Sequence, residues 1–469
     1  MQLPQKFIER TKIILKDEYS SFEKALEEEP SVSVRVNREK IDISPDLHQV
    51  PWCQDGYYLK ERANFTFDPL FHSGAYYVQE ASSMFLYQVI KQLVDAPVRY
   101  LDLCASPGGK TTLAISALPK GSLVVGNEID KKRANILSEN IIKWGSPFSI
   151  VTNNKPADFT KFTNYFDVIL TDVPCSGEGM FRKDEQAVAE WSEDNVKLCA
   201  SRQKSIIDDI WNALRPGGIL IYSTCTYNLE ENEQMIKHII DNYDAQPIEI
   251  KKDKSWQIID SLNGNDPVNR FMPHITKGEG LFMAAVRKPE EDDFEECSLL
   301  TPSKKNLKSK KKGSNNDTSI KIPGEVKNWV KNSSDFIFEV VRDKVIAYPK
   351  IYADDVKMLE DSLFVLKQPL SVASFKGKDF IPEHDLCMST QINKECFDSC
   401  EVSLTDALKY LRREALILPE NISKGFVVIT YKGFHLGWVK NIGNRSNNLY
   451  PNEWRIRSGF VPENIVTAL

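Results

Sequence analysis

Apolar residues recur with two different spacings along this chain, and each spacing predicts a type of element. From residue 2 to about residue 28 they lie near helical spacing, which predicts an amphipathic helical segment of two helices. After Pro30, the stretch SVSVRVN alternates between polar and apolar residues, as a half-buried strand does. We expect Arg35 and Asn37 on its polar face to be exposed, either free to bind a ligand or simply solvated. A helix is predicted to open at Tyr76 and to run toward Gln92.

From Val98 onward, short apolar runs alternate with helical patterns. Helices are predicted to begin at Lys110, at Asp130 and at Ser192, the second ending at Gly145. Such alternation is typical of an α/β domain with a mainly parallel sheet. The predicted strands are residues 98–103, 122–127, 148–152, 167–172 and 218–223.

Composition limits the class of protein. A chain of 469 residues is long enough for two or three domains, and no run approaches the ~18 apolar residues that would cross a membrane. Charges interrupt the N-terminal segment, so a signal peptide is not predicted. The nine cysteines are scattered singly and form no C-x-x-C pair, which argues against a disulfide framework and against zinc. We therefore expect a cytoplasmic protein with reduced thiols, no metal and no membrane contact.

The composition changes near residue 290. Six lysines crowd into residues 304–312, which predicts a flexible linker that either is a solvated tether or contacts phosphates. The chain end is also locally basic, although the net charge of the whole chain is −6. We expect its aromatic residues to stack on unpaired RNA bases, with a plain aromatic core as the alternative. These residues are Tyr431, Phe434, Trp438, Tyr450 and Trp454.

The stretch LDLCASPGGKTTLAI runs from a predicted strand through a tight turn into a helix. Gly108 and Gly109 let the backbone approach a ligand closely. The turn lacks the spacing of G-x-G-x-x-G and of a phosphate-binding P-loop, so it suits an adenosine-type ligand without a pyrophosphate. Glu128 lies 20 residues after Gly108, where an acid would meet ribose hydroxyls. A turn that binds nothing is the alternative.

Two cysteines follow strand ends on the edge of the sheet where ligands bind. Cys175 comes after the strand that ends at Asp172, and Cys225 follows the strand ILIYST. A parallel sheet can bring both thiols beside one ligand, which favours nucleophilic catalysis. Nearby cations can lower a thiol pKa, and the candidates are Lys110, Arg182 and Lys183. A redox pair of thiols and two space-filling cysteines are the alternatives.

Four motifs together, LDLCASPGGK, DVPCSGEGMFRKD, LRPGGILIYSTCTYNLEENE and YYVQEASSM, resemble the RNA (cytosine-5)-methyltransferases of the Nop/Sun type. The chain end, LGWVKNIGNRSNNLYPNEWRIR, is similar to the PUA-like RNA-binding domain of the bacterial branch that acts on 16S ribosomal RNA. The resemblance implies an α/β, Rossmann-like domain that depends on S-adenosylmethionine, with an N-terminal α+β module and a C-terminal α+β region. The implied domains are an N-terminal RNA-binding module (1–92), a methyltransferase domain (93–289), a charged linker (290–320) and a C-terminal region ending in the PUA-like domain (321–469).

The resemblance also implies the cofactor site. Glu128 would bind the ribose, and Asp172 would lie near both cofactor and cytosine. Where the family usually carries a further aspartate against the adenine, this chain has Asn154, with Asp158 as a nearby substitute. The methionine and ribose end of S-adenosylmethionine would be cradled by Cys104, Ala105, Ser106, Pro107, Gly108, Gly109 and Lys110.

In the implied mechanism, Cys225 is the nucleophile that adds to carbon 6 of cytosine, which makes carbon 5 reactive. Asp172 would stabilise charge at the ring, Cys175 would help to release the product, and Lys110 and Lys183 would assist. The terminal modules would hold ribosomal RNA or the small subunit, and we expect a monomer to suffice.

Three rival functions remain open from the sequence. A DNA cytosine methyltransferase uses the cysteine of its Pro-Cys motif, which this chain also has at Pro174-Cys175. Transfer RNA is an alternative substrate. A noncatalytic ribosome-assembly factor would keep the fold and the RNA-binding modules without methylating.

Overall fold

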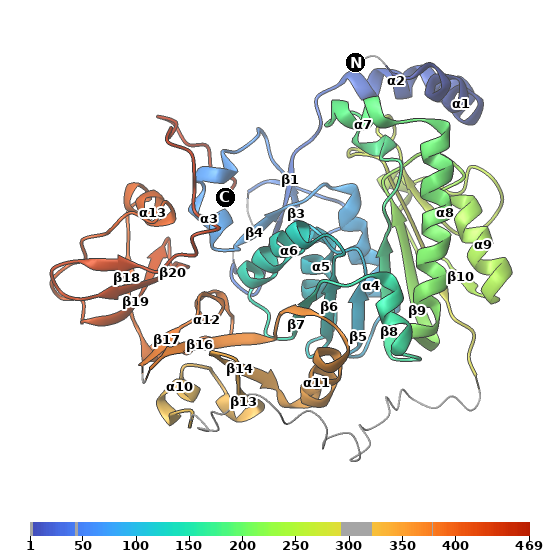
Figure 1. Cartoon of the computed structure of the whole chain (residues 1–469). Coiled ribbons are helices and arrows are strands. Elements are labelled where there is room, and N and C mark those ends of the chain that lie inside the picture. Colours follow the sequence, from blue (N-terminus) through green and yellow to red (C-terminus); the bar gives the residue numbers. More distant parts are fainter. Residues whose placement is uncertain (1–2, 43–45, 292–320, 378) are drawn as a thin grey trace.

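The computed structural model describes residues 3–42, 46–291, 321–377 and 379–469, and its centre is a nine-stranded sheet (Figure 1). The lysine-rich run at 304–312 lies outside the described residues. Five neighbouring strands are parallel, which confirms the predicted α/β class. Across the sheet they are β9 (Leu214–Thr224), β8 (Phe166–Asp172), β5 (Arg99–Asp102), β6 (Leu123–Asn127) and β7 (Ser149–Thr152).

Antiparallel strands complete both edges of this sheet. At one edge, β12 (Leu281–Arg287) pairs with β9 and carries β10 (Gln246–Ile248) and β11 (Asn269–Phe271). At the other edge, β15 (Val365–Lys367) pairs with β7, although it comes from the C-terminal half of the chain. The C-terminal region therefore contributes directly to the central sheet.

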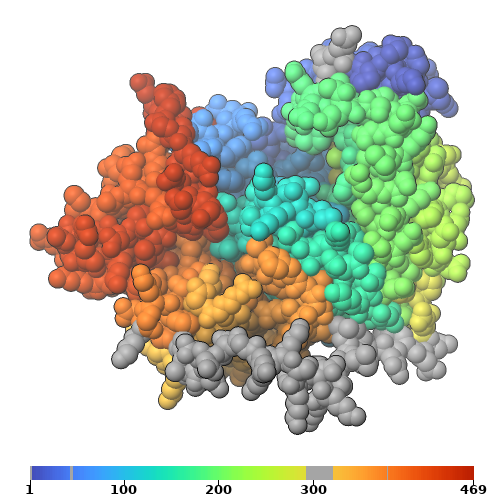
Figure 2. Space-filling model, viewed as in Figure 1, coloured from blue at the N-terminus to red at the C-terminus, as the bar shows by residue number. Residues whose placement is uncertain are grey.

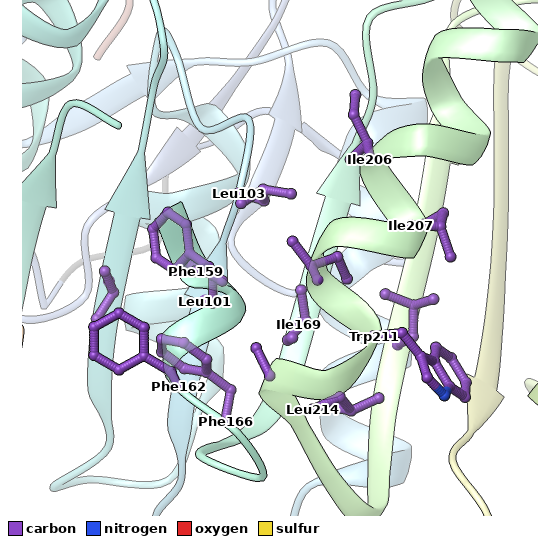
Figure 3. Close-up of a cluster of buried hydrophobic side chains, with 14 of the residues drawn as sticks. Leu101, Leu103, Phe159, Phe162, Phe166, Ile169, Ile206, Ile207, Trp211 and Leu214 are labelled. Atoms are coloured by element: carbon purple, nitrogen blue, oxygen red, sulfur yellow. The ribbon is translucent and has the colours of Figure 1, made fainter. Parts of the chain in front are cut away.

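Both faces of the parallel strands are covered, which explains why these strands are mainly apolar. Leu101 and Ile169 point to one face, where Figure 3 shows them beside Ile206 and Ile207 of α8. Tyr100 and its neighbours on the other face pack against α4 and α5. The helices of this domain are α4 (Leu86–Leu93), α5 (Gly109–Ala117), α6 (Lys131–Trp144), α7 (Glu185–Glu190), α8 (Glu193–Ile210) and α9 (Glu233–Tyr243).

The helices at the N-terminus pack against the central domain rather than standing apart. Figure 2 shows them over the green segment that contains α7 and the start of α8. Phe7 contacts Phe181 and Trp191, and Phe22 contacts Tyr227, in edge-to-face ring pairs. The elements of the N-terminal part are α1 (Gln5–Leu15), α2 (Tyr19–Glu27), β1 (Ser33–Val36), β2 (His48–Gln49), β3 (Gly56–Tyr58), α3 (Pro69–His72) and β4 (Tyr76–Val78).

Two expectations for this part are wrong. Arg35 and Asn37 are buried, at 1% and 0% exposed, because β1 lies between β3 and β4 and its polar face is covered by α5 and α6. Arg35 donates to Gln79 Oε1 at 2.8 Å and Thr112 Oγ1 at 2.6 Å. The predicted helix at Tyr76 instead begins as strand β4, because Tyr76–Val78 pairs with β1, and the helix starts only at Leu86.

The C-terminal region contains two four-stranded sheets in addition to β15. No helix among the described residues has the length and apolar character needed to cross a membrane. The elements of this region are α10 (Gly324–Asn328), β13 (Phe336–Val341), β14 (Lys344–Pro349), α11 (Ala353–Ser362), β16 (Leu370–Lys376), β17 (Asp379–Pro382), α12 (His384–Met388), β18 (Asp398–Glu401), α13 (Leu404–Leu411), β19 (Gly425–Tyr431), β20 (Phe434–Asn441) and β21 (Ser446–Asn448).

The aromatic residues near the chain end divide into two groups. Trp438 and Tyr450 are buried core residues, so the expectation that they stack on RNA is wrong for these two. Each side chain takes part in a core cluster, and Trp438 Nε1 donates to the carbonyl of Glu383. Tyr431, Phe434 and Trp454 remain half-buried.

Candidate functional site

Cys175 and Cys225 meet at the carboxyl edge of the central sheet. β8 and β9 are parallel neighbours, with Asp172 opposite Ser223, so the segments that follow them start at the same edge. The two sulfur atoms lie 3.2 Å apart, and both residues are half-buried. The strand order places this edge beside β5, where the connections diverge to opposite sides of the sheet. That divergence is where open α/β sheets bind ligands.

An ion pair lies beside the thiols. Lys110 Nζ is 2.8 Å from Asp172 Oδ2, and the lysine side chain is 14% exposed. Burial alone would lower the pKa of Lys110, but Asp172 and the nearby Cys225 more than offset this and raise it. Lys110 is therefore a fixed positive charge at neutral pH, and Cys225 lies within its electrostatic reach.

The other two candidate cations, Arg182 and Lys183, form ion pairs with Glu279. Arg182 Nη2 is 2.9 Å from Glu279 and also donates to the carbonyl of Gly278. Lys183 lies 3.4 Å from the same carboxylate. Both cations are therefore paired with Glu279 rather than with the two thiols.

The environment of Cys175 favours its protonated form. The hydrogen bond with Cys225 and then burial raise the pKa of Cys175 well above its usual range. Cys175 is thus held as a neutral thiol that can donate to the sulfur of Cys225. The charge of Lys110 acts on the other sulfur of the pair, that of Cys225.

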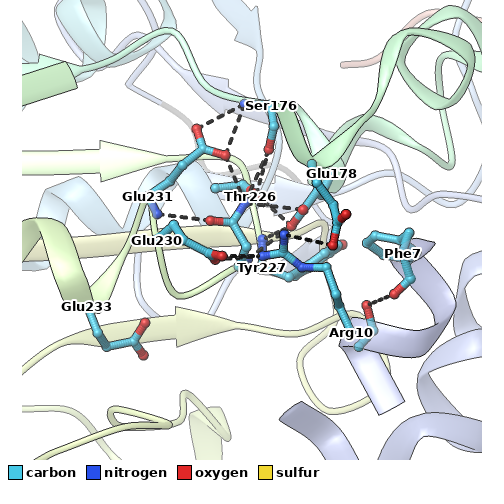
Figure 4. A network of polar contacts seen from close by, with 12 residues as sticks. Phe7, Arg10, Ser176, Glu178, Thr226, Tyr227, Glu230, Glu231 and Glu233 are labelled. Carbon is cyan, nitrogen blue, oxygen red and sulfur yellow. Dashed lines mark hydrogen bonds and ion pairs between the residues drawn. The ribbon is translucent and has the colours of Figure 1, made fainter. Parts of the chain in front are cut away.

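Two buried glutamates, which the sequence analysis passed over, join the segments around the cysteines (Figure 4). Glu178 follows Cys175 and accepts hydrogen bonds from Thr226 and Tyr227, which follow Cys225. Glu231 accepts from the main-chain nitrogen of Ser176 at 3.0 Å. The available signal was an acid in each cysteine motif, SGEG and NLEENE, although neither motif shows that the acid is buried.

The turn between β5 and α5 has the conformation that its glycines predict. Gly108 has φ +112°, a left-handed conformation that other residues rarely adopt. A Cβ added to Gly109 would lie 3.3 Å from the ring of Tyr77, so the turn is also closely covered from β4. Ser106, Pro107 and Ala105 are anchored through their main chain, which leaves the turn preorganised.

Within this turn, Cys104 is not suited to nucleophilic chemistry. Burial, followed by the nearby acids Asp102, Asp172 and Glu128, raises the pKa of Cys104. A thiol in that environment stays protonated and unreactive. Cys104 therefore contributes shape and backbone to the turn.

Asp102, at the end of β5, is a candidate ligand group that the sequence analysis missed. Its Oδ2 accepts from Thr111 Oγ1 at 2.6 Å, whereas its buried Oδ1 has no hydrogen-bond partner among the described residues. Burial raises the pKa of Asp102 to about 7. A buried acceptor without a partner beside a ligand-binding turn fits a ligand that carries an amino group. The signal was an acid closing the strand in LDLCASPGGK.

The predicted ribose and adenine residues lie at the ends of β6 and β7. Glu128 is 3% exposed, and its Oε1 accepts from the main-chain nitrogen of Asp130. The Asn154 amide faces the main chain of Phe364: Oδ1 accepts from its nitrogen at 3.0 Å and Nδ2 donates to its carbonyl at 3.2 Å. Asp158 accepts from Lys155 in its own turn. An aspartate at 154 could accept from Phe364 but could not donate back.

The described residues provide no group of three or more histidine, cysteine, aspartate or glutamate side chains arranged to hold a metal ion.

Three family profiles match successive parts of this chain. The family described as 16S rRNA methyltransferase RsmB/F matches residues 93–287. The N-terminal domain of 16S rRNA methyltransferase RsmF matches residues 3–81, and the methyltransferase RsmF PUA domain matches residues 397–456.

Individual proteins match along nearly the whole chain. Ribosomal RNA small subunit methyltransferase F of Serratia proteamaculans is 29% identical, and the match covers 98% of each chain. The protein of the same name from Vibrio parahaemolyticus is 27% identical, covering 96% of this chain and 97% of its own.

Solved structures match the central fold. A methyltransferase homolog protein from Pyrococcus horikoshii superposes with a TM-score of 0.53 at 26% identity, over 61% of this chain and 95% of its own. NSun6 from Pyrococcus horikoshii with SFG gives a TM-score of 0.52 at 20% identity, over 61% and 99%.

Proposed function

Because the chain belongs to the 16S rRNA methyltransferase RsmB/F family, we propose that it transfers a methyl group from S-adenosylmethionine to carbon 5 of a cytosine in 16S ribosomal RNA. The observation that carries this proposal is the 3.2 Å contact between Cys175 and Cys225 beside the Lys110–Asp172 ion pair. The carboxyl edge of the central sheet thus presents a nucleophilic cysteine, a second thiol and an ion pair to one ligand.

The need for a thiolate follows from the base. S-adenosylmethionine, when bound, supplies an electrophilic methyl group, and carbon 5 of cytosine is too electron-poor to attack it. Cys225, in the field of Lys110, adds to carbon 6 and makes carbon 5 nucleophilic. Asp172, which shares a proton with the Lys110 ammonium, would pass it toward ring N3 and so stabilise the negative charge that develops there. Bonding to carbon 6 removes the hydrogen bond with Cys225 that is the largest cause of the raised pKa of Cys175. Cys175 then loses its proton to solvent and, as a thiolate, takes the carbon 5 proton, and the bond between Cys225 and carbon 6 breaks as the product forms.

The cofactor would lie along the edge from β5 to β7. The turn of residues 104–110 would cradle its methionine and ribose end, and the free Oδ1 of Asp102 suits its amino group. Glu128 would accept from the ribose hydroxyls. We assign Asn154 to the adenine end of the cofactor site, where its side-chain amide is bonded to the main chain of Phe364 and its own main chain to the Asn127 side chain.

The domain assignments follow the same proposal. Residues 1–92 and the C-terminal part of 321–469 would hold RNA around the target, and residues 93–289 would carry out the chemistry. One chain supplies both cysteines, the ion pair and the turn, so a monomer suffices. The protein would act in the cytoplasm, on the small ribosomal subunit or its RNA.

Labelled methyl transfer tests the proposed function directly. The full chain is incubated with labelled S-adenosylmethionine and, separately, with 16S RNA, assembled small subunits and transfer RNA. We expect label in 16S RNA, and bisulfite sequencing to find a protected cytosine. Label in transfer RNA alone would reassign the substrate, and binding of 16S RNA without any transfer would favour the noncatalytic assembly factor.

A further inference from the structure

The carboxylate of Glu178 lies buried between the two segments that carry the cysteines. It is 2% exposed and begins a short turn, Glu178–Met180, just after Cys175. Its Oε2 accepts from Thr226 Oγ1 at 2.6 Å and from the main-chain nitrogens of Tyr227 and Asn228 at 2.8 and 3.0 Å. All three donors immediately follow Cys225.

The second oxygen also faces donors only. Glu178 Oε1 accepts from Trp191 Nε1 at 2.9 Å and from Asn228 Nδ2 at 3.1 Å. No ion pair among the described residues includes Glu178, so hydrogen bonds alone compensate its buried charge. Five hydrogen-bond donors and no acceptor among the described residues surround the two oxygens of Glu178. A carboxylate can accept from all five, whereas the NH2 group of an amide cannot accept.

Further contacts tie the same two segments together. The main-chain nitrogen of Gly179 donates to the carbonyl of Cys225 at 2.8 Å, and Ser176 Oγ lies 3.1 Å from Thr226 Oγ1. A Cβ at Gly179 would approach that carbonyl to 2.8 Å, so the two main chains are as close as they can be. Each cysteine is thus flanked by residues that are fixed to the other segment.

We propose that Glu178 is a positioning residue that holds the chain after Cys225 against the chain after Cys175, and so sets the separation and orientation of the two sulfurs. The inference deepens the proposed function, on which its kinetic consequences rest. The separation of the two sulfurs can be measured without RNA or cofactor, so the geometric part is tested independently of methyl transfer.

Glu178→Gln is the first test. Whichever way the amide is turned, its NH2 group faces at least two donors, and the segments move apart. Misplacement of catalytic groups by about 1 Å can cost ~100-fold in rate. We expect kcat to fall by about that factor, with little change in KM or in calorimetric affinity for S-adenosylmethionine. Glu230→Gln is the matched control, because Glu230 lies in the neighbouring segment and pairs instead with Arg10 at 2.6 Å.

The rate of disulfide formation reports the separation and orientation of the Cys175 and Cys225 sulfurs directly. Oxidised glutathione can convert the two thiols into a disulfide while it is reduced to two glutathione thiols, and peptide mass spectrometry follows the Cys175–Cys225 bond. In wild type and in Glu230→Gln the bond should form readily, and in Glu178→Gln much more slowly. If wild type forms the bond but methylates no RNA, the proposed function fails and the positioning role stands.

Two substitutions at Thr226, which donates to Glu178, perturb the same contact less if Glu178→Gln folds poorly. Thr226→Val removes one donor to Glu178, whereas Thr226→Ser keeps the hydroxyl and should restore the rate and the disulfide. The proposal is overturned if folded Glu178→Gln has wild-type kcat and disulfide formation. It is also overturned if Thr226→Val and Thr226→Ser are equally impaired.

Discussion

The sulfur of Cys175 lies 3.2 Å from the sulfur of Cys225, and the two thiols differ in what surrounds them. Contact with Cys225 and burial raise the pKa of Cys175, whereas the charge of Lys110 reaches Cys225. A neutral thiol next to a thiolate donates a hydrogen bond and stabilises it. This asymmetry supports Cys225 as the nucleophile and Cys175 as its partner.

The two cysteines should fail in different ways when replaced. Cys225→Ala should abolish methylation and any covalent adduct, because no thiolate adds to carbon 6. Cys175→Ala should still attack and methylate, but it should accumulate a protein–RNA species because the carbon 5 proton is removed slowly. A denaturing gel with labelled RNA and S-adenosylmethionine distinguishes them. An adduct from Cys225→Ala and none from Cys175→Ala would reverse the roles and restore the DNA-enzyme hypothesis.

Replacing Arg35 should destabilise the protein. Arg35→Met leaves Gln79 and Thr112 without their buried partner and removes the guanidinium from the ring of Trp144, 4.4 Å away. We expect a loss of about 2–4 kcal/mol in the free energy of unfolding, measured by urea denaturation. The control is Arg62→Met, an exposed arginine near Phe65, for which about 0.5 kcal/mol or less is expected. Equal losses would contradict a structural role for Arg35.

Asp102 should make stability depend on pH. Because burial raises its pKa from 3.8 to about 7, the folded state holds the proton more tightly than the unfolded state. The protonated Asp102 carboxyl contributes fully to the free energy of unfolding below about pH 4, and this contribution is lost as pH rises to about 7. Asp102→Asn still accepts from Thr111 and has no proton to lose, so its stability relative to wild type should rise across that range.

The size of that relative gain is a few kcal/mol at most, since one pKa unit corresponds to about 1.4 kcal/mol. Denaturation of the cofactor-free proteins at several pH values measures it. A difference between the two proteins that stays constant from pH 4 to pH 8 would show that Asp102 is already ionised throughout.

Exposed cations near the chain end should govern RNA capture. Lys440, Arg445 and Arg455 are exposed, and their replacement by Gln should weaken binding to 16S RNA and flatten its salt dependence. Each lost phosphate contact should reduce the slope of log K against log salt by about 0.7 for single-stranded RNA. The control exchanges Lys197, Lys204 and Lys237 for Gln, the same charge change on α8 and α9. A slope that falls equally in both triple variants would assign RNA binding to overall charge.

Local periodicity was sufficient to predict the strands of the parallel sheet, because a strand buried on both faces is a continuous apolar run. It also placed Cys175 and Cys225 at one edge, since parallel strands end together. It could not predict the surroundings of Arg35, because alternation separates the two faces of a strand and does not tell what covers each. Glu178 was missed for the same reason: five donors converge on it from Trp191 and from the segment after Cys225.

The pairing of β15 with β7 affects how the chain can be divided and how it is made. Asn154 and Phe364 at this junction are 210 residues apart, so β7 leaves the ribosome long before the strand that covers it. Until then the catalytic sheet has an unpaired edge, which is a site for wrong pairing and aggregation. A fragment that stops before β15 would keep that exposed edge permanently. A fragment of the catalytic domain that includes β15, more than 200 residues beyond β7, should therefore be less prone to aggregation than one that stops before it.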